Sequence, residues 1–126
     1  MLKTGFKALL AQANAVIETV SVQDFPYLQD EPDVVVVDVR EAIERETDGT
    51  IPGSLHASRG LLEFHADPEC PAHLPDLQPN KRIVLFCGTG GRSALAAKTL
   101  QDMGYSDVFS LGGGFAAWKA ANRKEG

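Results

Sequence analysis

The stretch VLFCGTGGRSALAAK, residues 84–98, decides how this chain folds and raises the question of what it does. A short apolar run ends in Cys87, a glycine-rich segment follows, and a segment rich in alanine and leucine comes next. The apolar run predicts a buried strand, and the last segment predicts a helix. Cys87 would then lie at the carboxyl end of a strand, where ligands bind in open parallel sheets.

Working outward, two more apolar runs predict buried strands: VVVVDV at residues 34–39 and DVFSL at residues 107–111. Weaker strands are expected near residues 18–20 and 54–57, and helices near 40–46, 61–65, 93–103 and 115–121. Ser21 followed by Asp24 resembles a capping box that opens a further short helix. Gly104 is placed for a left-handed cap of the longest helix. Strands that alternate with helices predict an α/β fold around a central, mainly parallel sheet of about five strands.

The N-terminal segment, residues 1–18, has apolar residues at helical spacing and predicts an amphipathic helix packed on the domain. It lacks the continuous apolar core of a secretory signal. An organellar transit peptide stays open as the alternative, because Lys3 and Lys7 precede the first acidic residue, Glu18.

Length and composition indicate one globular domain of 126 residues, with 44% hydrophobic and 23% charged residues. The net charge of −5 and the lack of a basic stripe argue against nucleic acid or an anionic membrane as partner. Cys70 and Cys87 form no CxxC pair, and the histidines are scattered, so no metal site and no cofactor is expected. Two unpaired cysteines favour a reducing compartment, and we expect a cytoplasmic protein.

The segment after Cys87 can build a binding site for an anion. Glycines at positions 88, 90 and 91 let successive backbone N–H groups point inward, and the helix expected from Ser93 adds its own unpaired N–H groups. A sulfur atom at the centre would be stabilised as a thiolate. The alternative is a buried cysteine that only ends a core strand. The glycines favour a nucleophile.

Two phosphate motifs fit poorly. A P-loop needs a lysine where Arg92 stands and a glycine where Phe86 stands, and the third glycine of GxGxxG falls on Ser93. Cysteine-dependent phosphatases use a Cys-x5-Arg loop closed by a bidentate arginine. Here the spacing from Cys87 to Arg92 is one residue shorter. A smaller ring of amides suits a smaller anion, such as a terminal sulfur.

The chain resembles a single-domain rhodanese, a sulfurtransferase, through VVVVDVRE, GTIPGSLHA, VLFCGTGGRSALAAKTLQDMGY and LGGGFAAW, in that order. The resemblance implies a three-layer rhodanese-like domain, which we place at residues 19–123. It also implies that a donor such as thiosulfate passes its outer sulfur to Cys87, and that a thiol or cyanide then removes it from the persulfide. A protein can replace either small molecule.

The chain departs from the family in two places. Thr50 stands where the family often has histidine, and Gly88 and Thr89 stand where many thiosulfate-using members carry a basic residue. A persulfide is therefore an alternative donor to thiosulfate. Arg59 follows a strand end and is a candidate to line the pocket mouth and supply the missing positive charge.

The predicted site has Cys87 as its catalytic residue. The substrate-binding residues are Gly88, Thr89, Gly90, Gly91, Arg92, Ser93 and Arg59, and the structural support comes from Asp38 and Arg40. Arg92 either binds the donor or turns back to pair with a carboxylate such as Asp38, and the second role is favoured. Two other functions stay open: a sulfur carrier or binding module without catalysis, and a phosphatase-like hydrolase.

Overall fold

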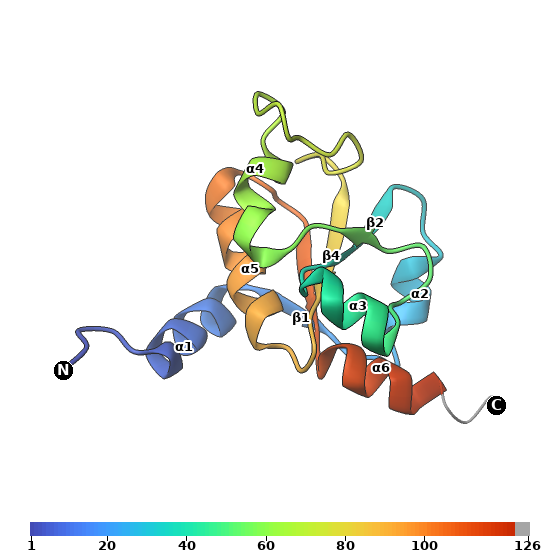
Figure 1. Ribbon diagram of the computed structural model, residues 1–126, viewed down its shortest axis with the longest axis horizontal. Helices are drawn as coiled ribbons and strands as arrows, with labels where there is room; N and C mark the ends of the chain where they lie inside the picture. Colours follow the sequence, from blue (N-terminus) through green and yellow to red (C-terminus); the bar gives the residue numbers. More distant parts are fainter. Residues whose placement is uncertain (123–126) are drawn as a thin grey trace.

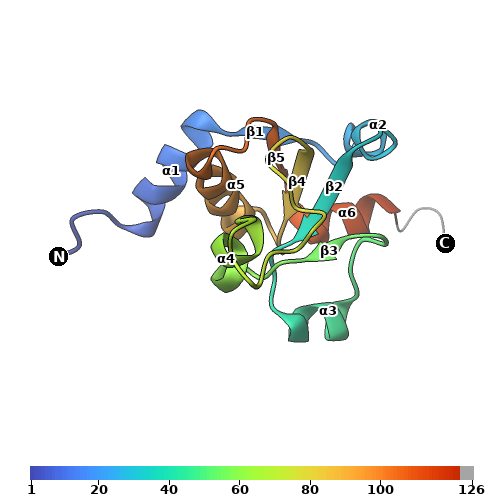
Figure 2. The same cartoon turned by 90° about the horizontal axis from the view of Figure 1, so that it is seen from above.

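The computed structural model describes residues 1–122, and its five strands form one parallel sheet (Figures 1 and 2). The strand order is β1-β5-β4-β2-β3. The strands are β1 (Glu18–Val20), β2 (Val34–Asp38), β3 (Leu55–His56), β4 (Arg82–Phe86) and β5 (Val108–Leu111). The predicted α/β fold with a central parallel sheet is confirmed.

The central strands are apolar throughout because both faces of the sheet are covered. Ile83 and Leu85 of β4 face one core cluster, and Val84 and Phe86 face the other. This alternation follows from the two-residue period of a strand. The first cluster is covered by α4 (Leu62–Ala66) and α5 (Gly91–Met103), and the second by α2 (Phe25–Gln29) and α6 (Gly114–Asn122). The sheet thus lies between two helical layers, as Figure 2 shows.

The remaining helices are α1 (Phe6–Val16), α3 (Ala42–Asp48) and a single 3-10 turn, η1 (Arg59–Leu61). Helix α1 lies against α5 with Ala13 buried. Phe6, Leu9 and Val16 of the same helix are exposed, so the domain covers only part of its apolar stripe. The division at residues 18 and 19 stays a prediction, and the predicted domain end at residue 123 lies outside the described residues. Over residues 1–122, no helix combines the length and the apolar character needed to cross a bilayer.

Three helix starts differ from the sequence prediction. The Ser21 hydroxyl accepts the N–H of Asp24 at 3.1 Å, but this closes a turn, and α2 begins only at Phe25. The complete capping box is formed instead by Glu41 and Glu44 at the start of α3, which therefore begins at Ala42 rather than at residue 40. Helix α5 begins at Gly91, two residues before Ser93. Gly104 ends α5 in the left-handed conformation, which confirms the predicted cap.

Candidate active site

Cys87 follows β4 directly and is only 1% exposed. The cysteine loop, residues 87–93, turns back at once because Gly90 adopts φ +115°, a conformation that favours glycine. The turn brings two backbone N–H groups onto the sulfur: Gly90 donates to Cys87 Sγ at 3.1 Å and Ser93 at 3.4 Å. The predicted amide nest is therefore present, with the sulfur atom at its centre.

A buried hydroxyl pair lies behind the sulfur. Ser93 Oγ is 3.6 Å from Cys87 Sγ and 2.8 Å from Ser110 Oγ on β5, and it also lies 3.2 Å from the carbonyl oxygen of Gly90. Here the Cys87 thiol donates to Ser93 Oγ, and the Ser93 hydroxyl donates to the Gly90 carbonyl. When the sulfur is a thiolate, the hydroxyl proton can turn to it instead. The sequence did not point to Ser110, because a serine within a strand gives no indication of the group that its hydroxyl will contact.

The surroundings of Cys87 act on its pKa in opposite directions. Burial raises the pKa of the thiol, since charge is costly away from water. The Ser93 hydroxyl and the backbone N–H groups of Ser93, Gly90 and Thr89 lower it, because they stabilise the thiolate. Together the hydrogen bonds outweigh burial, and the pKa of Cys87 lies below its usual value. The thiolate is the nucleophilic form of cysteine.

Helix α6 holds the start of the cysteine loop in place. The N–H of Phe115 donates to the carbonyl of Cys87 at 2.7 Å, and the N–H of Ala116 donates to that of Gly88 at 3.1 Å. The approach is close enough that a Cβ atom on Gly114 would stand 2.5 Å from the Cys87 carbonyl oxygen. The first turn of α6 therefore fits only because Gly114 has no side chain.

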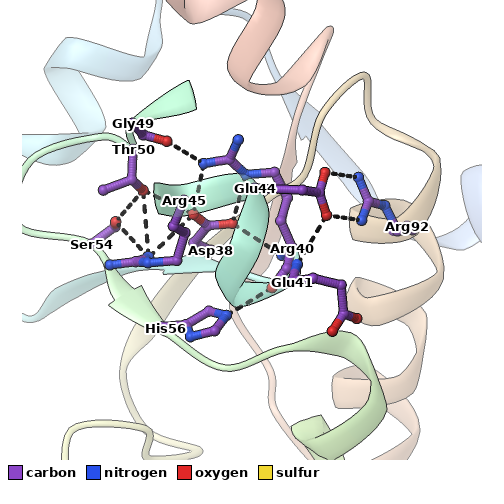
Figure 3. Close-up of polar contacts among 10 residues, drawn as sticks. All are labelled: Asp38, Arg40, Glu41, Glu44, Arg45, Gly49, Thr50, Ser54, His56 and Arg92. Carbon is purple, nitrogen blue, oxygen red and sulfur yellow. Dashed lines mark hydrogen bonds and ion pairs between the residues drawn. The ribbon is translucent and has the colours of Figure 1, made fainter. Parts of the chain in front are cut away.

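Arg92 braces the loop from outside, but through a different carboxylate from the one predicted. Its Nη1 and Nη2 atoms bind the two carboxylate oxygens of Glu44 on α3 at 2.7 and 2.9 Å (Figure 3). Arg92 thus pairs with a carboxylate, as favoured from the sequence, but the carboxylate is not Asp38, the example named there, because Asp38 is already enclosed by other donors. The bond from Arg92 lowers the pKa of Glu44 to about 2.

Asp38 and Arg40 form a buried pair at the end of β2 (Figure 3). The carboxylate of Asp38 accepts the backbone N–H, Nε and Nη2 of Arg40, each at 3.0 Å. Arg45 and Thr50 also donate to it, at 3.1 and 2.8 Å. Burial raises the pKa of Asp38, but the bonds from Arg40 and Thr50 overcome this and lower it. The Arg40 guanidinium lies 4.4 Å from the ring centroid of Phe115, so the pair also supports α6.

Arg59 does not reach the cysteine loop. Its Nη1 binds Glu63 at 3.1 Å and its Nη2 donates to Thr99 on α5 at 3.0 Å. The side chain lines a hollow between α1 and α5, together with Leu9 and Lys98. The predicted place at the pocket mouth is wrong, because η1 begins at Arg59 and puts Glu63 one helical turn away on the same side.

Two hollows open beside the cysteine loop and share Thr89. One, of about 320 Å³, lies towards α1, and the other, of about 310 Å³, lies between α3 and α6. Within residues 1–122, no group of three or more histidine, cysteine or acidic side chains is placed to hold a metal ion. Cys70 is a free, half-buried loop residue that lines neither hollow. The chemistry of this site therefore rests on one sulfur and the groups that surround it.

The protein is thus an α/β domain with a buried cysteine at the carboxyl end of a parallel strand, where backbone N–H groups meet the sulfur and lower the pKa of the thiol. The chain belongs to the Rhodanese-like domain family, which matches residues 21–121. This confirms the family resemblance drawn from the sequence. It also leaves α1 outside the region that the family shares.

Three relatives bear on function. A thiosulfate sulfurtransferase, GlpE, from Pseudoalteromonas translucida is 35% identical over 81% of this chain and 89% of its own. A tRNA uridine(34) hydroxylase from Acaryochloris marina is 33% identical over 80% of this chain, which spans only 32% of that protein. A solved structure from Rhodopseudomonas palustris, of unknown function and described as a possible tyrosine phosphatase, is 47% identical with a TM-score of 0.91, covering 97% of this chain and 94% of its own.

Proposed function

We propose that the protein is a sulfurtransferase that carries a sulfane sulfur on Cys87 between a small-molecule donor and a thiophilic acceptor. The observation that carries this proposal is the convergence of two backbone N–H groups, those of Gly90 and Ser93, on one sulfur atom, beside the Ser93 hydroxyl that also lowers the pKa of the thiol. They stabilise a negative charge on sulfur, and the nearby Arg92 guanidinium adds to this effect. A terminal persulfide sulfur carries the same kind of charge.

The reaction proceeds in two displacements. In the first, Cys87 Sγ attacks the outer sulfur of thiosulfate, the S–S bond of the donor breaks, and sulfite leaves with the electron pair. In the second, a thiolate or cyanide attacks the outer sulfur of the Cys87 persulfide, and Cys87 leaves as the thiolate from which it started. The lowered pKa of Cys87 favours the thiolate, the form that attacks without a general base.

The GlpE relative supports thiosulfate as a donor, since that protein is named a thiosulfate sulfurtransferase and the two chains match over most of both lengths. The neutral residues Gly88 and Thr89 favour a donor of lower charge, such as an organic persulfide. A protein donor or acceptor fits the same chemistry. Both cysteines are free, and we propose a reducing, cytoplasmic location.

A sulfur carrier is the second candidate, because the same nest would hold a persulfide that a partner protein loads and unloads. A phosphatase is disfavoured by the position of Arg92. In a phosphatase loop the arginine binds the phosphoryl oxygens in a bidentate manner. Here both terminal nitrogens of Arg92 are bound to Glu44 instead.

Intact-protein mass spectrometry after exposure to thiosulfate or an organic persulfide tests the proposal. We expect a mass increase of one sulfur atom in the native chain and in Cys70→Ser, and none in Cys87→Ser. Cys70→Ser is the matched control, since it removes the other free thiol. Addition of cyanide or a thiol should remove the extra sulfur and return Cys87 to its starting form, ready for another cycle. Sulfur on Cys87 that only a protein partner removes would favour a carrier, and turnover of aryl phosphates would favour a hydrolase.

A further inference from the structure

The hollow between α3 and α6 has no role in the chemistry described so far. Residues of both helices line it. The hollow has a volume of about 310 Å³, at the lower end of the range for small-molecule sites. It opens directly beside the nucleophile, since Gly88 and Thr89 of the cysteine loop form one wall. A sulfur compound that reaches Cys87 from this side would have its organic part at this wall.

Two of the four charged residues around this hollow are already neutralised. Arg40 is paired with Asp38, and Glu44 is paired with Arg92. The other two are the ammonium group of Lys119 and the carboxylate of Asp48, and both residues are exposed. Among the residues that the structure describes, neither of these two forms an ion pair. The hollow therefore offers one cation and one anion to a ligand.

The cysteine loop itself fixes the position of Lys119. The N–H of Ala116 is bonded to the carbonyl of Gly88, and Lys119 is three residues further along the same helix, about 4.5 Å along its axis. Its Nζ lies 6.0 Å from the ring centroid of Phe115, which also lines the hollow. Phe115 and Ala116 supply an apolar surface between the loop and the ammonium group. This arrangement suits a short carbon chain with a charged end.

We infer that this hollow binds the organic part of the sulfur acceptor, and that the acceptor is a small thiol bearing a carboxylate, of the amino-acid type. Lys119 binds the carboxylate, and Asp48 favours an ammonium group on the same molecule. The thiolate of this acceptor attacks the outer sulfur of the Cys87 persulfide. The S–S bond to Cys87 breaks, and the acceptor leaves as its persulfide while Cys87 returns to the thiolate. The inference rests on the proposed function, because it needs Cys87 to carry sulfur.

The test separates loading from discharge. The protein is loaded with sulfur, the donor is removed, and the rate of sulfur loss from Cys87 is followed by mass spectrometry with four thiols. These are mercaptoethanol, which is neutral; mercaptoacetate, an anion; cysteamine, a cation; and cysteine, which carries both charges. Each rate for a variant is divided by that of the native chain with the same thiol, so that differences in intrinsic thiol reactivity cancel.

We expect Lys119→Gln to slow discharge by mercaptoacetate and cysteine about fivefold, with mercaptoethanol unchanged, since removing an exposed charge contact costs at most about that factor. Lys119→Glu should slow discharge by these two thiols further and speed discharge by cysteamine. Asp48→Asn should slow discharge by cysteamine and cysteine but not by the other two thiols. Lys98→Gln on α5 is the matched control, because Lys98 is also a helix lysine at the surface but is paired with Asp102 and lines a different hollow.

The outcomes are distinct. Equal slowing of all four thiols by Lys119→Gln, or no slowing of any, overturns the inference and leaves the sulfurtransferase proposal intact. The same selective change in Lys98→Gln also overturns it, because the effect would then be one of overall charge. If Cys87 takes up no sulfur from any donor, the proposed function fails and the inference falls with it. Melting temperatures of the variants should stay close to that of the native chain, because both side chains are exposed.

Discussion

Replacement of Gly114 by alanine tests the geometry on which the cysteine loop depends. Gly114 adopts φ +61°, and an added Cβ would lie 2.5 Å from the carbonyl oxygen of Cys87 and 2.8 Å from the carbonyl carbon and oxygen of Gly88. These are backbone atoms, so no side-chain rotation can relieve the contact. Either α6 or the cysteine loop must move.

The cost of Gly114→Ala has two sources. The left-handed conformation costs an alanine about 1 to 2 kcal/mol. Separation of α6 from the loop weakens two hydrogen bonds, from Phe115 to Cys87 and from Ala116 to Gly88, each of which contributes about 0.5 to 1.5 kcal/mol. Together these give a loss of about 2 to 5 kcal/mol in the free energy of unfolding.

Two other glycines separate these sources. Gly104 has φ +113° and nothing within 4 Å of an added Cβ, so Gly104→Ala should cost only the conformational 1 to 2 kcal/mol or so. Gly60 has an ordinary backbone conformation and open space as well, and Gly60→Ala should change stability by less than about 0.5 kcal/mol. The order of destabilisation should be Gly114, then Gly104, then Gly60.

Urea unfolding followed by the fluorescence of the single tryptophan, Trp118, measures these differences. Trp118 is stacked on Phe115 at 5.6 Å between ring centroids and so reports on α6. Sulfur loading of Cys87 is measured on the same samples, and only Gly114→Ala should slow it, because only that change displaces the loop. Equal destabilisation by Gly114→Ala and Gly104→Ala, with normal sulfur loading, would refute the close contact between α6 and the loop.

Three more changes test the surroundings of the sulfur. Ser93→Ala should raise the pKa of Cys87, measured from thiolate absorbance against pH, since it removes the hydroxyl while the backbone N–H groups stay; an unchanged titration would contradict this. Glu44→Gln should lower the free energy of unfolding near neutral pH. The difference from the native chain should shrink below about pH 4.5, because the folded pKa of Glu44 is about 2 and the stabilisation from its charge is lost as pH falls towards that value. Arg59→Ala should leave kcat/KM for thiosulfate within about twofold of the native value, and a larger loss would show that Arg59 acts on the donor after all.

The strands and most helices were predictable because they depend on local patterns. The runs around Val36 and Val84 are apolar on both faces, which is typical of a central parallel strand, and Gly104 stands where a helix must end. The helix starts were less predictable. Helix α5 begins at Gly91 because Gly90 takes the left-handed turn, and a sequence does not show which of several adjacent glycines does so.

The position of Cys87 at the end of a strand was predictable, and the contacts around it were not. The apolar run before Cys87 and the glycines after it, in that order, indicate a cysteine that ends a strand and begins a tight loop. The partners of Arg92, Arg59 and Ser110 depend on which elements the fold brings together: Arg92 meets α3, Arg59 meets α5, and Ser110 meets the first turn of α5. An arginine has enough reach to find several carboxylates, so its partner is decided by tertiary packing rather than by spacing along the chain.

The position of Arg92 also limits the charge that this loop can hold. Both terminal nitrogens of Arg92 are bound to Glu44, so the fork of this guanidinium, which would clamp a phosphoryl group, already holds a carboxylate. The groups that donate to the sulfur itself are two neutral N–H groups, and Arg92 adds its positive charge from nearby. Neutral donors stabilise a single charge on sulfur well, but a phosphate dianion needs a cation such as the bidentate arginine of the phosphatases. The loop is therefore better matched to a persulfide than to a phosphoryl group. The short spacing from Cys87 to Arg92 supports the same conclusion.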